Sequence, residues 1–149
     1  MATKSFKGRS LLAGKLKGKA LASKHPFNTT GSYLTNIATG NTTNAPCTDA
    51  NNPDFYKKDL NGAIICTTTT VGSSLGGATL MGVGSLGLGP QAMLFSQHID
   101  SVSFAGLVMD DVWNGRRVIT IDQLGDEFLD TVKSGDPISI KEDGTVEVG

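Results

Sequence analysis

The sequence has too few cysteines and histidines for the commonest disulfide, metal and hydrolase sites. Its two cysteines, Cys47 and Cys66, cannot form a disulfide scaffold and lack the CxxC spacing of metal and redox motifs. The only histidines are His25 and His98, and no GxSxG motif offers either of them a serine nucleophile. We therefore expect free, partly buried thiols, no catalytic residues, no metal site and no cofactor.

Long apolar runs, charges and aromatic residues are also scarce. No apolar segment approaches the length of a membrane span, and scattered charges make the N-terminus a poor secretory signal, so we expect no membrane contact. Charged residues make up 18% of the chain and aromatic residues 6%, whereas glycine occurs 19 times. This composition favours short strands and turns around an aliphatic core over long helices.

The charges that are present divide by sign along the chain. From residue 99 onward, eleven acids face four bases, a balance of −7 (4 minus 11). The basic end could fold back on its own domain, reach a neighbouring copy or lie on another acidic surface. We predict that the basic side chains before the first acid, Asp49, bind a partner electrostatically. They are Lys4, Lys7, Arg9, Lys15, Lys17, Lys19 and Lys24.

Two regions follow from the residue pattern. Residues 1–58 contain helix-weakening glycines and then many Asn, Thr, Pro and Gly residues, which predicts an extended, largely irregular N-terminal arm. Residues 59–149 begin with the β-branched run 63–71 and predict a β-rich domain, either a small β-barrel or a β-sandwich. The glycines of residues 72–90 are too dense for a packed helix, and the GxGxxG match within them lacks a surrounding βαβ pattern.

The last fifty residues carry the strongest strand pattern. Residues 102–109 and 117–121 each predict a strand, and residues 138–140 and 145–148 predict a hairpin around Asp143-Gly144. Residues 123–133 fit either a short helical turn or an irregular strand.

Few side chains in this half suggest chemistry. Trp113 either closes the end of a barrel or anchors an interface. We interpret His98 beside Asp100 as a surface histidine next to an acid. Asp110 and Asp111 would point to opposite faces of a strand, which argues against a shared metal.

The run Phe104–Val108, the strand Arg117–Ile121 and the pairing of Ser134-Gly135-Asp136-Pro137 with Asp143-Gly144-Thr145-Val146 resemble capsid cement or head-decoration proteins of tailed bacteriophages. The resemblance covers about the last fifty residues. It implies a non-enzymatic virion protein, made in the host cytoplasm, that binds the major capsid protein on the capsid surface, commonly as a homotrimer. Multivalent contacts of the basic arm would then stabilise the lattice.

The sequence leaves three alternatives open, and one of them is an enzyme in which Asp110, Asp111 and His98 converge in a pocket. A phage tail or baseplate component would also combine a small β-domain with an extended arm. A nucleic-acid-binding protein would use the basic tail on phosphates, although the acidic half would repel nucleic acid.

Overall fold

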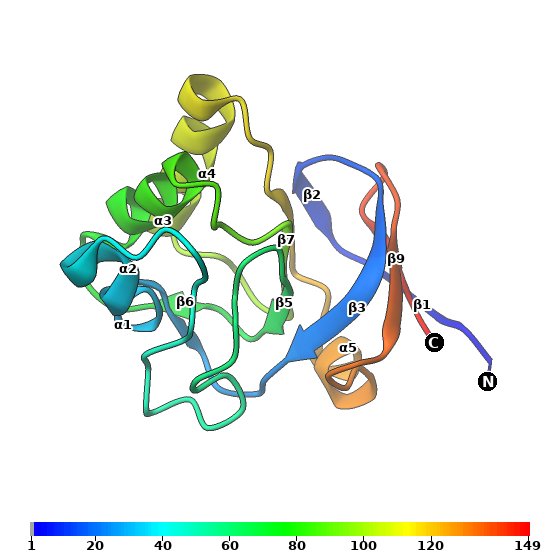
Figure 1. Cartoon of the computed structure of the whole chain (residues 1–149). Coiled ribbons are helices and arrows are strands. Elements are labelled where there is room, and N and C mark those ends of the chain that lie inside the picture. Colours follow the sequence, from blue (N-terminus) through cyan, green and yellow to red (C-terminus); the bar gives the residue numbers. More distant parts are fainter. Residues whose placement is uncertain (1) are drawn as a thin grey trace.

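Eight strands form one barrel-like sheet that is nearly closed (Figure 1). The computed structural model describes residues 2–149. Along the sheet the strands follow the order β1-β10-β9-β3-β5-β7-β8-β2, so β1 and β2 lie at its two edges. Only Gly8 separates these two strands in the sequence, and the chain itself therefore links one edge to the other. This confirms the coarser prediction of a mainly β, barrel-like fold.

The strands of the large sheet are β1 (Lys4–Lys7), β2 (Arg9–Leu12), β3 (Leu16–Ala22), β5 (Ile64–Thr67), β7 (Ala92–Phe95), β8 (Ile119–Asp122), β9 (Pro137–Ile140) and β10 (Thr145–Val148). A second sheet pairs β4 (Phe27–Asn28) with β6 (Thr70–Val71). The helices are α1 (Thr29–Ser32), α2 (Leu34–Thr39), α3 (Gly76–Ser85), α4 (Ser101–Asn114) and α5 (Asp126–Thr131). None of the helices that the structure describes has the length and apolar character needed to cross a membrane.

The prediction of an irregular N-terminal arm is wrong, because the first three strands belong to the sheet. β1 pairs antiparallel with β10, β2 pairs with β8, and β3 lies between β9 and β5. Phe6 is buried and packs edge-on against Phe128. The glycines of this region permit close packing instead of disorder. A Cβ atom on Gly8 would lie 2.5 Å from the carbonyl oxygen of Asp122.

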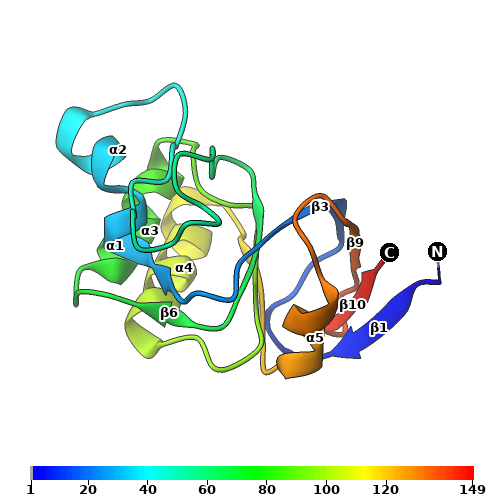
Figure 2. The ribbon, with the colours of Figure 1, turned by 90° about the horizontal axis from the view of Figure 1, so that it is seen from below.

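The helices of the central region cover one side of the sheet (Figure 2). Strands β3, β5, β7 and β8 run parallel, and parallel neighbours require crossover connections. The connection from β5 to β7 contains α3, and the connection from β7 to β8 contains α4. These two helices pack directly against each other. The crossovers bring the N-termini of α3 and α4 near the carboxyl ends of the parallel strands.

Alternating side chains of the central strands fill two separate cores. Ile64 of β5 and Leu94 of β7 face the barrel interior together with Phe128. Ile65 and Phe95, one residue further along the same strands, face the helices instead. Because both faces are covered, β5 and β7 are buried throughout, as is typical of parallel strands between two layers.

The strand predicted at residues 102–109 and the prediction that residues 72–90 hold no packed helix are wrong, whereas the C-terminal hairpin and the strand near residues 117–121 are confirmed. Residues 102–109 form most of helix α4, whose start is capped by Asp100 and whose end is set by Gly115 at a φ of 67°. The glycine-rich segment contains helix α3. The hairpin of β9 and β10 and the strand β8 are present close to their predicted positions.

Candidate functional site

A polar hollow lies where helices α3 and α4 begin. Its volume is about 190 Å³, whereas pockets that enclose a whole small molecule measure roughly 300 to 1,000 Å³, so it can hold one group of a ligand. Ligands of parallel sheets bind at this edge, beyond the carboxyl ends of the strands. The lining residues come from strand β6, from the loop between β6 and α3, and from the start of α4. They are Thr70, Val71, Gly72, Ser73, Ser74, Asp100, Val102 and Ser103.

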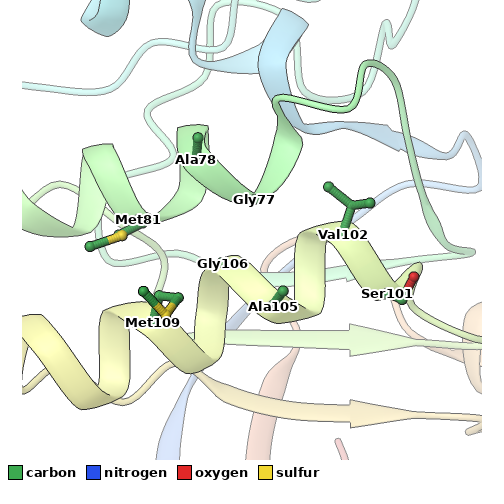
Figure 3. Close-up of a pocket in the computed structure, with 8 residues that line it drawn as sticks. All are labelled: Gly77, Ala78, Met81, Ser101, Val102, Ala105, Gly106 and Met109. Carbon is green, nitrogen blue, oxygen red and sulfur yellow. The ribbon is translucent and has the colours of Figure 1, made fainter.

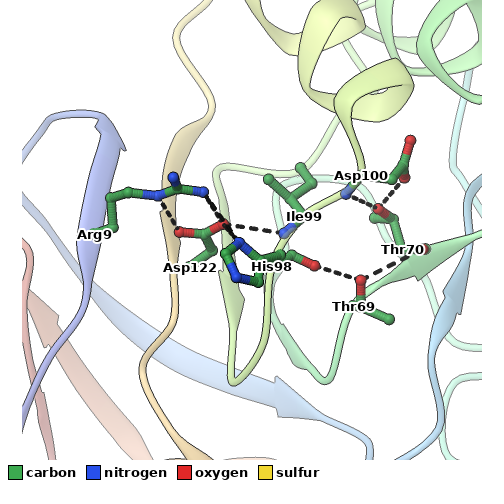
Figure 4. Close-up of polar contacts among 7 residues, drawn as sticks. All are labelled: Arg9, Thr69, Thr70, His98, Ile99, Asp100 and Asp122. Carbon is green, nitrogen blue, oxygen red and sulfur yellow. Dashed lines mark hydrogen bonds and ion pairs between the residues drawn. The ribbon is translucent and has the colours of Figure 1, made fainter.

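Asp100 is held by three hydrogen bonds at the edge of this hollow, and Figure 4 shows the two that it forms with Thr70. The Thr70 hydroxyl donates to the Asp100 carboxylate, and the backbone N–H of Asp100 donates back to Thr70 Oγ1 at 3.1 Å. The backbone N–H of Ser103 donates to Asp100 Oδ1 at 2.9 Å. Burial raises the pKa of Asp100, but the hydrogen bonds from Thr70 and Ser103 outweigh it and lower the pKa overall. Asp100 is therefore ionised at neutral pH.

The loop before α3 offers hydrogen-bond donors to the hollow. Ser73 and Ser74 are both exposed, and Ser73 Oγ accepts the N–H of Leu75 at 3.1 Å. The Ser74 hydroxyl makes no hydrogen bond with the residues that the structure describes. The start of α3 is held by Ser73, whose Oγ accepts the Leu75 N–H and whose carbonyl oxygen accepts the Gly76 N–H at 3.0 Å, so the Ser74 hydroxyl is the donor that remains available to a ligand.

Gly72 makes the turn into this loop possible. Its φ is 117°, a conformation that side-chain-bearing residues rarely adopt. A Cβ atom there would also lie 2.6 Å from Asn28 Oδ1, an atom that caps helix α1. The loop geometry thus depends on glycine at this position.

A second polar cluster supports the segment before Asp100 (Figure 4). Asp122, fully buried at the end of β8, accepts hydrogen bonds from Arg9 Nε at 2.9 Å and Arg9 Nη2 at 2.8 Å. It also accepts the backbone N–H of Ile99 at 3.1 Å. His98 Nδ1 lies 4.0 Å from the same carboxylate, and the carbonyl oxygen of His98 accepts the Thr69 hydroxyl. Asp122 therefore fixes residues 98–99, and through them the position of Asp100.

The seven predicted partner-binding cations fall into two groups. Four of them form ion pairs with acids from the second half of this same chain: Lys4 with Glu127, Lys7 with Asp143, Arg9 with Asp122, and Lys24 with Asp130. Lys15, Lys17 and Lys19 lie along or next to β3, are exposed, and form no ion pair with the described residues. Partner binding by the basic side chains stays a prediction.

Trp113 is 69% exposed at the end of α4, so it does not close the barrel. Its role as an interface anchor stays a prediction. His98 faces Asp122 and Arg9 rather than pairing with Asp100. Sequence reasoning singles out none of the hydroxyl residues of the hollow. The signal that could find them is a Gly-Ser-Ser loop between a β-branched run and a segment that proves helical.

Asp110 and its neighbour Asp111 lie on helix α4 and have opposite environments. Asp110 is buried beside Gly84, its Oδ1 accepts Asn114 Nδ2 at 2.8 Å, and its Oδ2 has no hydrogen-bond partner among the described residues. Burial raises the pKa of Asp110, and the Asn114 hydrogen bond offsets only part of this effect. Asp111 is paired with Arg117 at 2.7 Å, and that hydrogen bond lowers the pKa of Asp111.

We expect Asp110→Asn to stabilise the protein by about 1 kcal/mol at neutral pH. A carboxyl whose pKa is raised on folding stabilises the fold only while it is protonated, and this contribution is lost as pH rises through the folded-state pKa. The gain from the substitution should therefore vanish at about pH 3.5, below the ordinary pKa of an aspartate. Urea unfolding at neutral pH and at about pH 3.5 measures the difference in free energy of unfolding between this variant and the parent protein. Asp111→Asn is the matched control and should instead destabilise at neutral pH. A loss of stability in Asp110→Asn at neutral pH would contradict this account of the buried carboxyl.

Comparison with known proteins places this fold in a family. The family model described as the aconitase X swivel domain matches residues 5–148. The chain belongs to the aconitase X swivel domain family. The crystal structure of Thermococcus kodakaraensis aconitase X in its holo-form superposes with a TM-score of 0.79 and 20% identity, covering 98% of each chain. The solution NMR structure of a UPF0107 protein superposes with a TM-score of 0.73 and 19% identity, covering 98% of this chain and 99% of that one. A search of curated proteins found no match.

Membership of the aconitase X swivel domain family corrects the functional predictions. The resemblance to phage cement proteins is wrong, since the family model spans nearly the whole chain and the resemblance rests on turn motifs in its last third. The virion location, the major capsid protein as partner, and the tail and nucleic-acid alternatives are likewise unsupported. The family is named for an enzyme, which conflicts with the expectation of a non-enzymatic protein.

The holo-form of the solved aconitase X implies a bound group in that protein. The described residues of this chain do not form a metal centre of their own. Cys47 and Cys66 are buried in different cores, and burial raises the pKa of both thiols. No three His, Cys, Asp or Glu side chains converge on a common point within residues 2–149.

Proposed function

We propose that this chain is the swivel-domain part of an aconitase X-type hydro-lyase and that its polar hollow binds a carboxylate group of the substrate. The observation that carries the proposal is the exposed hydroxyl of Ser74, which lines the hollow and makes no hydrogen bond with the described residues, in a chain matched by the swivel-domain model over residues 5–148. A serine hydroxyl is a suitable hydrogen-bond donor to a carboxylate.

An aconitase-type reaction removes water from a hydroxy acid, or adds it to the unsaturated acid. It requires donors that hold the substrate carboxylate, a base that takes a proton from carbon and an acid that protonates the departing hydroxyl. In the hollow, the loop Gly72–Ser74 supplies donors. The charge of Asp100 is satisfied by hydrogen bonds from Thr70 and Ser103, which join strand β6 to the start of α4.

The hollow is only part of an active site. Asp100 is the one ionisable side chain among its lining residues, and its lowered pKa makes it a poor proton donor. The remaining acid–base groups must then come from the catalytic part of the enzyme, whether this is a separate chain or another segment of a longer one. The function of this chain is to position one end of the substrate against those groups.

The proposal is tested by Ser74→Ala in the enzyme assembled with its catalytic part. Dehydration is followed by the ultraviolet absorbance of the unsaturated acid. Losing one hydrogen bond to a charged group lowers kcat/KM by about 10- to 100-fold. Ser85→Ala, an exposed serine at the other end of the same helix, is the matched control and should keep full activity. Full activity in a folded Ser74→Ala enzyme would exclude this role for the hollow.

A further inference from the structure

The surface formed by helices α3 and α4 lacks the charges that normally cover a solvent-facing helix. No Asp, Glu, Lys or Arg occurs between Asp59 and Asp100. Helix α3 lies wholly inside this stretch, and α4 has no charge in its first nine residues, Ser101–Met109. A helix that faces water carries polar and charged residues on its outer side. This side of the molecule therefore has the composition of a surface that another domain or protein chain covers.

An apolar groove runs between the two helices (Figure 3). Its volume is about 400 Å³. Gly77 and Gly106 bring the helix backbones into contact, since a Cβ atom on Gly106 would lie 2.1 Å from the carbonyl oxygen of Gly77. The side chains along the groove are all uncharged. The lining residues are Gly77, Ala78, Met81, Ser101, Val102, Ala105, Gly106 and Met109.

The apolar side of the groove continues along helix α4 as an exposed stripe, in which Val102, Ala105 and Met109 also line the groove and Val112 and Trp113 extend it. The inner side of this helix packs on the core through Leu107. The outward residues follow helical spacing and end in two strongly exposed side chains, Val112 at 67% and Trp113 at 69%. A helix that is apolar on two sides is typical of a position between two packed layers. The stripe consists of Val102, Ala105, Met109, Val112 and Trp113.

The groove adjoins the polar hollow of the candidate site. Val102 lines both. A domain or chain that closes over the hollow would therefore also contact Val102 at this end of the groove. Under the proposed function, the body that completes the hollow is the catalytic part of the enzyme.

We propose that the groove and the α4 stripe form the docking surface for the catalytic part of the aconitase X-type enzyme, which fills them with uncharged aliphatic or aromatic side chains. This inference rests on the proposed function, because the shared residue Val102 links docking to completion of the site. Trp113 is the anchor at the far end of the stripe. The contact is driven by apolar burial, which salt does not screen.

The test measures binding of this chain to the catalytic aconitase X polypeptide of the same organism. Trp113 is the only tryptophan, so biosynthetic fluorotryptophan places a single fluorine label at the proposed anchor. We expect its NMR resonance to shift on binding. The dissociation constant should stay constant or fall between about 0.05 and about 0.5 M NaCl. A fluorine resonance that does not move, or an affinity that falls steeply with salt, would overturn the proposal.

Substitutions locate the contact. The double variant Met109→Glu with Val112→Glu should weaken binding by at least about 100-fold, because it places two charges in an apolar interface. Tyr56→Glu, at an exposed apolar residue outside the groove and the stripe, is the matched control and should bind normally. Unchanged binding of the double variant, or a dimer of this chain that the same variant disrupts, would refute docking of the catalytic part here.

The same proteins separate the two proposals. If Ser74→Ala binds normally but loses activity, and the double variant does not bind, both proposals hold. If the double variant binds normally while Ser74→Ala is inactive, the docking surface is wrong and the proposed function stands. If Ser74→Ala is fully active while the double variant fails to bind, the docking surface stands and the role of the hollow is wrong.

Discussion

Replacing Gly106 by alanine is expected to lower the free energy of unfolding by about 3 kcal/mol. The new methyl group would lie 2.1 Å from the carbonyl oxygen of Gly77, far inside van der Waals contact. The obstructing atom is backbone in helix α3, so no side-chain rotation can relieve the overlap. The helices must move apart, and the core packing of Leu80 and Leu107 is then lost. Urea unfolding followed by circular dichroism measures the change.

Gly82→Ala provides the control for this substitution. Gly82 also lies on α3, but a Cβ atom at this position would meet no other atom within 4 Å. Alanine has a higher helix propensity than glycine, so this variant should gain about 0.5 to 1 kcal/mol. Equal effects at the two positions would show that general helix propensity, and not the contact with Gly77, determines the stability of this pair of helices.

The parts of the fold that the sequence predicts correctly are those set by local chemistry. The hairpin of β9 and β10 follows from alternating apolar residues around Asp143-Gly144, where Gly144 has a φ of 88°. Strand β8 follows from a β-branched run. In both cases, neighbours in the sequence determine the conformation.

The elements that sequence reasoning misses depend on contacts between distant residues. The glycines of α3 have the composition of a helix breaker, yet Gly77 is required by Gly106, 29 residues later in the sequence (106 minus 77). Strands β1 to β3 gain their order by pairing with strands near the other end of the chain. The sequence shows that the two ends carry opposite charge. It does not show whether the basic end pairs with its own domain, with a neighbouring copy or with another acidic surface. Pairing within one chain, as between Lys24 and Asp130, is one of the three.

The candidate site could not be predicted from the sequence, because its residues are distant from one another along the chain. Thr70 and Asp100 are 30 residues apart, and only the parallel arrangement of β5 and β7 brings them into hydrogen-bond contact. The sequence places Asp100 beside His98, whereas its structural partners are Thr70 and Ser103. Serine and threonine are common surface residues, so those of the hollow do not stand out in the sequence. Their proximity is apparent only once the positions of α3 and α4 are known.

Replacing Asp122 by alanine should destabilise the protein by about 3 kcal/mol. The carboxylate is fully buried and accepts two hydrogen bonds from Arg9 and one from the backbone of Ile99. Arg9 is half exposed and can turn to water, but the buried N–H of Ile99 loses its acceptor and the side chain leaves a cavity. Thermal or urea unfolding of the purified chain measures this loss.

The loss at Asp122 should extend to the candidate site, because Ile99 directly precedes Asp100. Amide hydrogen exchange should quicken at Ser103, whose N–H is held by Asp100. Asp130→Ala, which removes the exposed partner of Lys24, is the matched control and should change neither stability nor exchange measurably. If Asp122→Ala unfolds at the same urea concentration as Asp130→Ala, the buried carboxylate does not hold the segment before Asp100, and that segment must be positioned by the hydroxyls of Thr69 and Thr70 alone.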